Sequence, residues 1–256
     1  MTEAQRVRAE GLRGWFELQL RLAEVAAERR GAPLGETVGL LTNLHRRFGL
    51  GTLDPQAVSP FWRRYVEGLE ARATLEERLD WTVRCCAEGP PPTTARPVFG
   101  CFAYDPPDAA LGDGVVRIHF ENRDDDGVSP LADDKLGRRR ADAAAMFGHI
   151  AAAHADAHTV KGGSWLYNLE AYRRLFPPQY GASRQRPEPL RLNGTSSWGQ
   201  LIDHRGQVKP AAREAFLTRL RDLDPDAPWR VFPLPALAVS APLAAFTAFY
   251  GERIGD

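Results

Sequence analysis

The chain has 256 residues, of which 43% are hydrophobic and 26% charged, a composition typical of a globular protein with a sizeable core. Thirty-three basic residues balance thirty-three acidic ones, so no overall electrostatic field favours nucleic acid or an anionic membrane as a partner. The sequence has no apolar run of about 18 residues, the length that spans a bilayer, and its charged N-terminus lacks the apolar core of a signal peptide. We therefore predict a cytoplasmic protein with neither a nucleic-acid nor a membrane partner.

The cysteines agree with that compartment. Cys85, Cys86 and Cys101 are the three in the chain. An odd count with a vicinal pair and no CxxC spacing argues against both a disulfide framework and a zinc ribbon. We expect reduced and mostly buried thiols.

The first ninety residues have a helical pattern. Apolar side chains recur three to five residues apart over residues 3–30, which predicts an amphipathic helix that ends at Gly31. Further helices are predicted around Glu36–Phe48, in "DPQAVSPFWRRYVEGLEA" and in "TLEERLDWTVRCCAE". In the last of these, Thr74 and Glu77 have the spacing of a capping box. Residues 1–90 are therefore predicted to form a helical N-terminal region.

The segment "EGPPPTTARP" separates this region from the rest, because three consecutive prolines favour an extended connector. The two segments "VFGCFAYD" and "VVRIHFEN" are rich in β-branched and aromatic residues and are predicted to be strands. A helix with Ser129 as N-cap should then run to about His154.

The remaining pattern alternates strands and helices. In chain order we predict a strand at Thr159–Tyr167, a short helix near Glu170–Phe176, the loop "PPQYGASRQRPEP", a strand at "SSWGQLID", a helix at "VKPAAREAFLTRLRDL", a strand at "ALAVS" and a last helix at "APLAAFTAFYG". This alternation predicts an α/β sheet domain over residues 91–256. The expected fold class is α+β, with a mixed sheet flanked by helices and preceded by the helical region.

Three of the six histidines lie close together in "HIAAAHADAHTVKGGSWLYN". His154 and His158 are about 40° apart around a helix and would share a metal only with a third ligand, such as His119 or Glu121. HExxH is absent, because Ala155 stands in the place of the glutamate. We favour a role at the helix end, where histidines complement free carbonyls, and no metal. A metal-dependent hydrolase remains an alternative.

The residues after the histidines allow several interpretations. Ser164 lies in G-x-S-x-L, which misses the second glycine of a nucleophile elbow. Gly162 and Gly163 indicate a bulge or turn, or a place where a ligand approaches the backbone. Free N–H groups beside Lys161 would form an anion site. Tyr167 is expected either in the core or at a cleft as a proton donor.

Two charged segments lie between the predicted strands. The acidic stretch Arg123–Asp126 resembles a metal-binding loop without the spacing of an EF-hand, so we expect a solvated turn. For Gly137–Arg140, on the following helix, we expect a solvent-exposed face, with phosphate contact as the alternative.

The order of strand "VVRIHFEN", acidic loop, long helix, strand "GGSWLYN", short helix and "LFPPQY" resembles the bacterial GNAT-like acyltransferases, over about residues 98–205. The resemblance implies acyl-coenzyme A as donor and a small amine-bearing substrate as acceptor. It implies that His119 or Glu121 is the general base and that Tyr167 protonates the departing thiolate. The residues expected to contact substrate or coenzyme A are Lys161, Gly162, Gly163, Ser164 and Asn168.

One departure from this family concerns the turn that binds pyrophosphate, Q/R-x-x-G-x-G/A. The corresponding segment here is "NRDDDGVSPL", with one glycine and three aspartates that would repel a pyrophosphate. Coenzyme A would then bind differently, or the domain no longer acylates. The alternative to an acyltransferase is therefore a non-catalytic binding or accessory protein whose helical N-terminal region packs on a protein partner.

Overall fold

The computed structural model describes residues 2–51, 58–90, 96–109, 111–124, 126–188 and 191–251. The chain divides into two compact units, each discontinuous in sequence. The helical unit comprises Met1–Thr94 and Pro189–Pro235, and the sheet unit comprises Ala95–Glu188 and Ala236–Asp256. The fold class is α+β, with a five-stranded mixed sheet flanked by helices and with helices at the N-terminus, as predicted.

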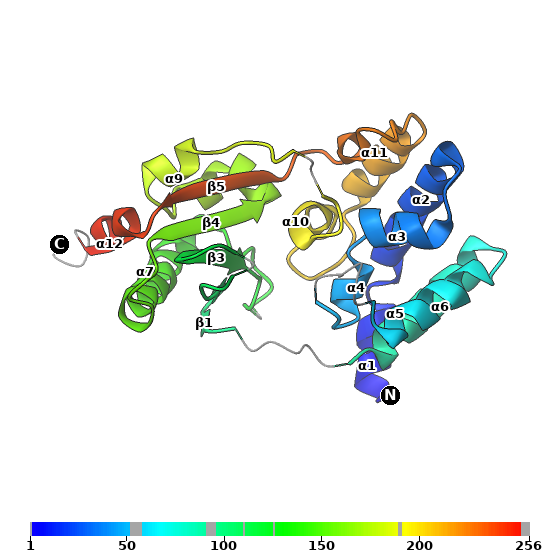
Figure 1. Cartoon of the computed structure of the whole chain (residues 1–256), viewed down its shortest axis with the longest axis horizontal. Helices are drawn as coiled ribbons and strands as arrows, with labels where there is room; N and C mark the ends of the chain where they lie inside the picture. Colours follow the sequence, from blue (N-terminus) through cyan, green and yellow to red (C-terminus); the bar gives the residue numbers. More distant parts are fainter. Residues whose placement is uncertain are drawn as a thin grey trace. The chain divides into compact units, whose positions relative to one another are not determined.

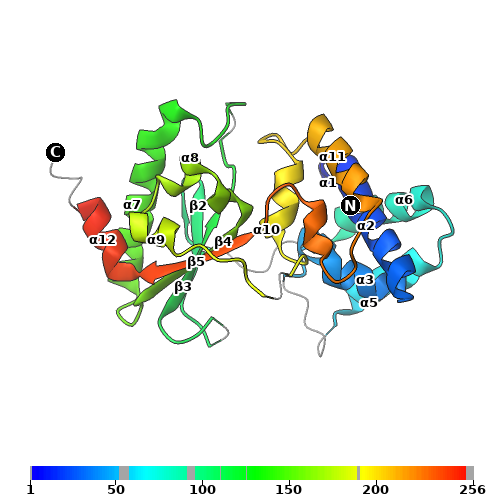
Figure 2. The same ribbon diagram turned by 90° about the horizontal axis from the view of Figure 1, so that it is seen from above.

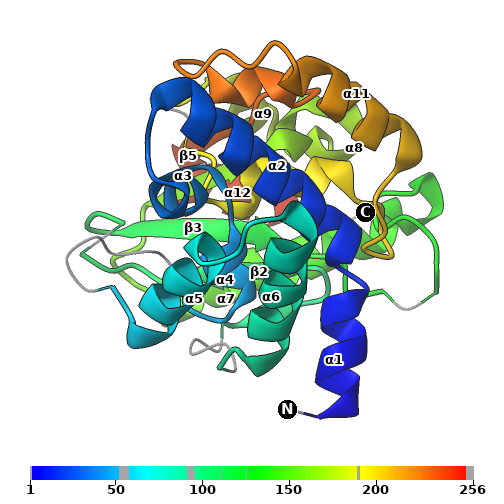
Figure 3. The ribbon, with the colours of Figure 1, turned by 90° about the vertical axis from the view of Figure 1, so that its right-hand side faces the viewer.

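The helical unit is built around one long helix, α2, which crosses it between α6 and α11 (Figure 3). The elements of this unit are α1 (Glu3–Glu10), α2 (Arg13–Arg30), α3 (Leu34–Leu41), α4 (Leu44–Arg47), α5 (Pro60–Glu70), α6 (Leu75–Glu88), α10 (Thr195–Trp198), η3 (Gly199–Leu201), α11 (Pro210–Leu220) and η4 (Pro228–Val231). Gly31 ends α2 in the left-handed conformation with a φ of 60°, which glycine adopts without steric cost. The prediction of that helix end is confirmed.

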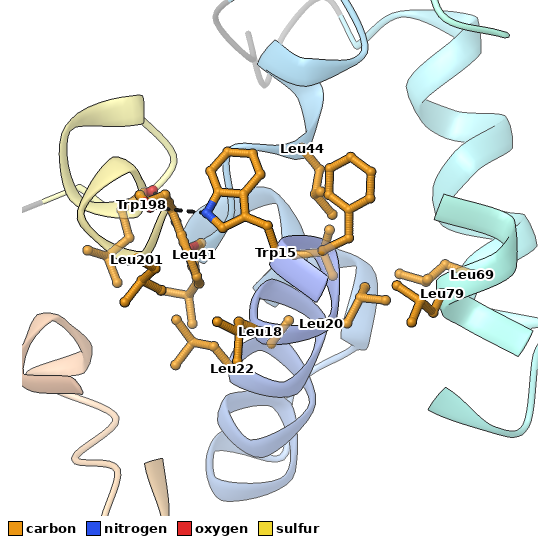
Figure 4. Close-up of a cluster of buried hydrophobic side chains, with 14 of the residues drawn as sticks. Trp15, Leu18, Leu20, Leu22, Leu41, Leu44, Leu69, Leu79, Trp198 and Leu201 are labelled. Carbon is orange, nitrogen blue, oxygen red and sulfur yellow. Dashed lines mark hydrogen bonds between the residues drawn. The ribbon is translucent and has the colours of Figure 1, made fainter. Parts of the chain in front are cut away.

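Two buried tryptophans join the segments of the helical unit (Figure 4). Trp15 Nε1 donates a hydrogen bond to the carbonyl oxygen of Trp198 over 3.0 Å. Trp198 Nε1 in turn donates to the carbonyl oxygens of Leu41 and Leu192 over 3.1 Å each. These bonds give each buried indole N–H a partner. They also tie the segment around Trp198 to the N-terminal helices, although the sequence predicts residues 91–256 as one sheet domain.

The strand predicted at "SSWGQLID" is wrong, because the structure places α10 and η3 there. Trp198 and Leu201 are both fully buried and lie three residues apart. That spacing puts them on one side of a helical turn, whereas strand side chains share a face at every second residue.

The capping box predicted at the start of α6 is confirmed. Thr74 Oγ1 accepts a hydrogen bond from the backbone N–H of Glu77 over 3.2 Å, and Glu77 Oε2 accepts one from the backbone N–H of Thr74 over 3.0 Å.

We expect Thr74→Ala to lower the free energy of unfolding by about 1 kcal/mol, because a backbone N–H at the helix start loses its acceptor. Thr74→Ser, which keeps the hydroxyl, should retain most of that stability. Urea unfolding followed by tryptophan fluorescence measures the change, since Trp15, Trp62, Trp81, Trp198 and Trp229 all belong to the helical unit. An unchanged midpoint would mean that the box contributes no stability.

The sheet unit contains five strands in the order β1-β2-β3-β4-β5. The strands are β1 (Val98–Phe99), β2 (Phe102–Asp105), β3 (Val115–Phe120), β4 (Thr159–Ser164) and β5 (Leu237–Pro242), and the helices are η1 (Asp133–Lys135), α7 (Leu136–Ala153), η2 (Trp165–Asn168), α8 (Glu170–Arg173), α9 (Pro178–Ala182) and α12 (Leu243–Gly251). Neighbouring strands are antiparallel except β3 and β4, which are parallel and connected through α7.

Two predicted strands are shorter than expected. "VFGCFAYD" folds as the hairpin of β1 and β2, with Gly100 in the turn at a φ of 57°. The strand predicted to reach Tyr167 ends at Ser164, whose Oγ accepts a hydrogen bond from the backbone N–H of Leu166 and so caps η2.

One face of the sheet carries the core of the unit. The buried side chains of the strands on this face are Phe102, Tyr104, Val116, Ile118, Val160, Val239 and Ala241, packed with residues of α7, α8, α9 and α12. Helices α7 and α12 lie side by side there (Figures 1 and 2), and the rings of Phe147 and Phe246 stack 4.3 Å apart. We call this the helix face.

The opposite face carries the alternate residues of the same strands. Its polar side chains are Asp105, Arg117, His119, Lys161 and Ser240, and we call it the polar face. Arg117, Lys161 and Ser240 are exposed, whereas Asp105 and His119 are about one quarter exposed. Within the described ranges, no helix combines the length and apolar character needed to cross a membrane.

Candidate functional site

A row of polar residues crosses the polar face from β2 to β5. Asp105, Arg117, Lys161 and Ser240 are directly opposite one another in the successive strand pairs. His119 follows two residues after Arg117 on β3, so both side chains point from the same face. The row places an acid, two cations, a hydroxyl and an imidazole on one face of the sheet.

The two cations of this row, Arg117 and Lys161, form the last residue pair of the parallel pairing between β3 and β4. The ladder consists of Val115↔Thr159, Val116↔Val160 and Arg117↔Lys161, and no later residue of β3 pairs with β4. On its other side β4 continues in unbroken register with β5, through Gly162↔Val239 and Gly163↔Ala238. The glycines therefore form no bulge. The carboxyl ends of parallel strands are where open α/β sheets bind ligands.

His119 is held by an acid on the neighbouring strand. Its Nε2 lies 2.7 Å from Asp105 Oδ2, and Arg96 Nε lies 2.5 Å from Asp105 Oδ1. Burial opposes ionisation of Asp105, but the hydrogen bonds and charges of His119 and Arg96 outweigh it and lower the pKa of this carboxyl to about 2. A carboxylate can only accept, so Nε2 is the donor in this contact, and in the tautomer that carries its proton on Nε2 the other ring nitrogen, Nδ1, is the acceptor.

Tyr167 lies on the other side of the sheet. Its hydroxyl is 3.0 Å from that of Tyr180, and both rings are fully buried in the core of the helix face. Burial and the neighbouring Tyr180 raise its pKa well above 10. The structure therefore does not bring Tyr167 together with His119 in a common cavity. The acid role of Tyr167 stays a prediction.

The other residues expected at the site are dispersed. Glu121 follows β3, is exposed and forms an ion pair with Arg123 at 2.9 Å. Asn168 Nδ2 donates to the carbonyl oxygen of Trp165 over 2.8 Å, and Ser164 caps η2 as described above. Gly162 packs against the tyrosine hydroxyls on the helix face, whereas Gly163 is exposed beside Lys161 on the polar face. Of the predicted residues, His119, Lys161 and Gly163 share the polar face.

The clustered histidines make separate contacts. His154 is the C-cap of α7, as expected for a helix end, and its Nε2 lies 3.0 Å from the Tyr104 hydroxyl. His158 Nδ1 lies 2.9 Å from Thr159 Oγ1, and His149 is exposed next to the ring of Phe99. In the part of the chain that the structure describes, no group of three or more His, Cys, Asp or Glu residues is placed to hold a metal ion.

The acidic loop after β3 is closed by ion pairs. The side chain of Asp124 is 3% exposed and forms ion pairs with Lys135, at 2.8 Å, and with Arg139. Arg139 is 1% exposed and also binds Asp142 at 2.6 Å. The expected solvated turn and solvent-exposed helix face are therefore wrong for Asp124 and Arg139. The charge of Asp124 is neutralised locally, while Asp125 lies outside the described residues.

Sequence reasoning missed Arg96, Asp105 and Arg117. Asp105 stands at the end of a predicted strand, and alternation along "VVRIHFEN" puts Arg117 and His119 on one face. Their convergence depends on the register of β2 against β3, which no single strand segment contains. A family of sequences in which positions 105 and 119 vary together would have been the signal.

No family model matches the chain, and no curated protein or solved structure is significantly similar to it.

Proposed function

We propose that the sheet unit transfers an acyl group from acyl-coenzyme A to a small amine on the polar face, with His119 as general base. The observation that carries this proposal is the 2.7 Å contact between His119 Nε2 and the Asp105 carboxylate. A carboxylate that fixes one imidazole nitrogen orients the other toward a substrate and stabilises the imidazolium formed when a proton is taken up.

The chemistry assigned to the chain is proton transfer. Acyl-coenzyme A, when bound, supplies a thioester carbonyl carbon. His119 Nδ1 accepts the proton that the amine loses as its nitrogen forms the new C–N bond. The C–S bond breaks, and the same imidazolium returns a proton to the departing sulfur. Asp105 acts as a positioning residue and touches no reacting atom.

The order of elements supports this class of reaction. Strand β3, the long helix α7, strand β4 and the short helix α8 follow in the order on which the resemblance to GNAT-like acyltransferases depends. The neutralised Asp124 reduces the repulsion that the acidic loop would exert on a phosphate.

A non-catalytic binding protein is the second candidate, and a specific observation favours it. Tyr167, the expected proton donor for the thiolate, is buried in the core of the helix face. A domain that has kept the fold but lost one of two proton-transfer groups would bind ligands without turnover. Its helical unit would then serve as the surface for a protein partner.

The test measures thiol release by the full chain from acetyl-coenzyme A with a panel of small primary amines. We expect His119→Gln to lower kcat/KM by about 10²- to 10⁴-fold, the usual contribution of general base catalysis. Asp105→Asn should shift the acidic limb of the pH–rate profile. If Asp105 served only to hold the fold together, its replacement would not shift that limb. His149→Gln, at an exposed histidine of the same unit away from the polar face, is the matched control.

Two results would overturn the assignment. Unchanged turnover in a folded His119→Gln variant would remove His119 as the base. Stoichiometric binding of acetyl-coenzyme A with no turnover of any amine would favour the binding protein.

A further inference from the structure

We infer that Arg117 and Lys161 bind an anionic group on the acceptor, so that the substrate class is a small amine with a carboxylate or phosphate a few atoms from its nitrogen. This inference rests on the proposed function for the amine, but the anion site stands on the geometry of the two cations alone.

Arg117 and Lys161 lie opposite each other on neighbouring strands, and within the described ranges neither has a counter-ion. Arg117 and Lys161 are Cα partners at the end of the parallel ladder and are both exposed. Neither forms an ion pair or a side-chain hydrogen bond with any residue in the described ranges. Two positive charges this close repel each other, so an anion between them would remove an unfavourable interaction.

The nearest carboxylate is already occupied. Asp105 is opposite Arg117 in the β2–β3 register, yet its two oxygens contact His119 and Arg96. Glu121 is paired with Arg123. Among the described residues of the polar face, Arg96, Arg117 and Lys161 stand against the one carboxylate of Asp105, so the charge where the parallel ladder ends is positive.

The chemistry of the two side chains suits an oxyanion. The guanidinium of Arg117 matches the two oxygens of a carboxylate or phosphate, and the ammonium of Lys161 is a compact point charge. Neighbouring strands lie about 4.8 Å apart, so both side chains reach one anionic group. The exposed Ser240, opposite Lys161 on β5, supplies a hydroxyl donor at the same row.

The spacing assigns this anion to the acceptor rather than to coenzyme A. Arg117 and His119 are two residues apart on one strand, or about 7 Å. In coenzyme A the long pantetheine arm separates the diphosphate from the sulfur, so a diphosphate at Arg117 would place the thioester far from His119. A compact amine with its own anionic group fits a base and an anion site this close together.

The experiment compares matched ligands that differ only in the anion. Glycine is paired with glycinamide, and O-phosphoethanolamine with ethanolamine. Binding to the full chain is measured by calorimetry at low and high salt, and thiol release from acetyl-coenzyme A is measured separately. We expect the anionic member of at least one pair to bind more tightly, with an affinity that falls as salt increases. A preference for glycine indicates a carboxylate, and a preference for O-phosphoethanolamine a phosphate.

The variants test the two cations. Arg117→Gln and Lys161→Gln should each weaken binding of the anionic ligand about fivefold, a value reduced by solvent screening at an exposed site. Lys161→Arg, which keeps the positive charge, should retain binding. That result would show that the weaker binding of Lys161→Gln comes from the lost charge and not from misfolding. Arg84→Gln, at an exposed arginine of the helical unit, should bind like the wild type.

Failure of this inference is distinguishable from failure of the proposed function. Turnover of neutral and anionic amines with equal kcat/KM, unaffected by both Gln variants, would overturn the anion site and leave the acyltransferase intact. Salt-dependent binding of an anionic amine without turnover would support the anion site and overturn the reaction. No binding of any anionic ligand would overturn the anion site.

Discussion

Replacing Gly162 with alanine is expected to destabilise the sheet unit by about 3 kcal/mol or more, whereas the same replacement at the adjacent Gly163 is expected to leave its stability unchanged or slightly higher. The two glycines are neighbours in β4, so the backbone cost of glycine in a strand is the same for both. What differs is the face on which a new methyl group would lie.

A methyl group at Gly162 would lie within the core of the helix face. It would overlap the hydroxyl oxygen of Tyr167 and lie 2.5 Å from that of Tyr180. Both hydroxyls belong to fully buried rings, and their 3.0 Å hydrogen bond is enclosed by Tyr172 and Phe176. Because both rings are fully buried among other aromatic side chains, the strand or the hydrogen-bonded pair must move. At Gly163 no atom lies within 4 Å of the added carbon.

Urea unfolding of the two variants, followed by far-ultraviolet circular dichroism, measures this difference. Equal stabilities would show that the tyrosine hydroxyls yield easily and that the core around Gly162 is not tightly packed. If the Gly162→Ala variant were stable but no longer bound acyl-coenzyme A, Gly162 would instead be a residue whose backbone the ligand approaches.

The sequence predicted the elements whose pattern is local. Alternation along "VVRIHFEN" placed Val116, Ile118 and Phe120 opposite His119, and the structure has the first two in the core and His119 on the polar face. The Thr74–Glu77 spacing predicted a capping box that is present. Both signals depend on residues within one turn or one strand, so no tertiary contact is needed to interpret them.

The candidate site depends on contacts that are not local. Asp105 and His119 meet because β2 and β3 pair in one register out of several, and Arg117 meets Lys161 across a connection through α7. Arg139 is expected in solvent because it stands in a run of three arginines, yet its side chain is 1% exposed and forms an ion pair with Asp124. Composition cannot distinguish it from its neighbours. For Tyr167 the core is the default expectation and a proton donor at a cleft the alternative, and only the packing of the folded chain separates the two.

The helical unit is expected to lose stability in mild acid because of one buried imidazole. His45 in α4 is 1% exposed, and its ring packs edge-on against Trp62 at 5.8 Å. Burial, with a smaller contribution from the positive charge of Arg46, lowers the pKa of His45 to about 4 from its ordinary value of 6.5. Among the residues that the structure describes, its Nδ1 has no hydrogen-bond partner, so no carboxylate there is placed to accept a hydrogen bond from the protonated ring.

The direction of the pH dependence follows from which state binds the proton. Between pH 6.5 and 4 the unfolded chain protonates His45 and the folded chain does not, so protons favour unfolding in this range. The contribution of the neutral imidazole is fully present above pH 6.5 and is lost as the pH falls to 4, at a cost on the order of 3 kcal/mol. Asp105 and Asp124, whose pKa values are lowered to about 2, lose their contributions only below pH 3.8.

The measurement is the free energy of unfolding in urea from pH 7 to pH 4, followed by tryptophan fluorescence as for Thr74. We expect His45→Gln, whose side chain does not titrate, to flatten the curve between pH 6.5 and 4, and His149→Gln, at an exposed histidine, to leave the slope as in the wild type. If His45→Gln kept the full acid dependence, the buried imidazole would not be its source. A flattened curve would mean that protonation of the buried His45 ring is what destabilises the helical unit between pH 6.5 and 4.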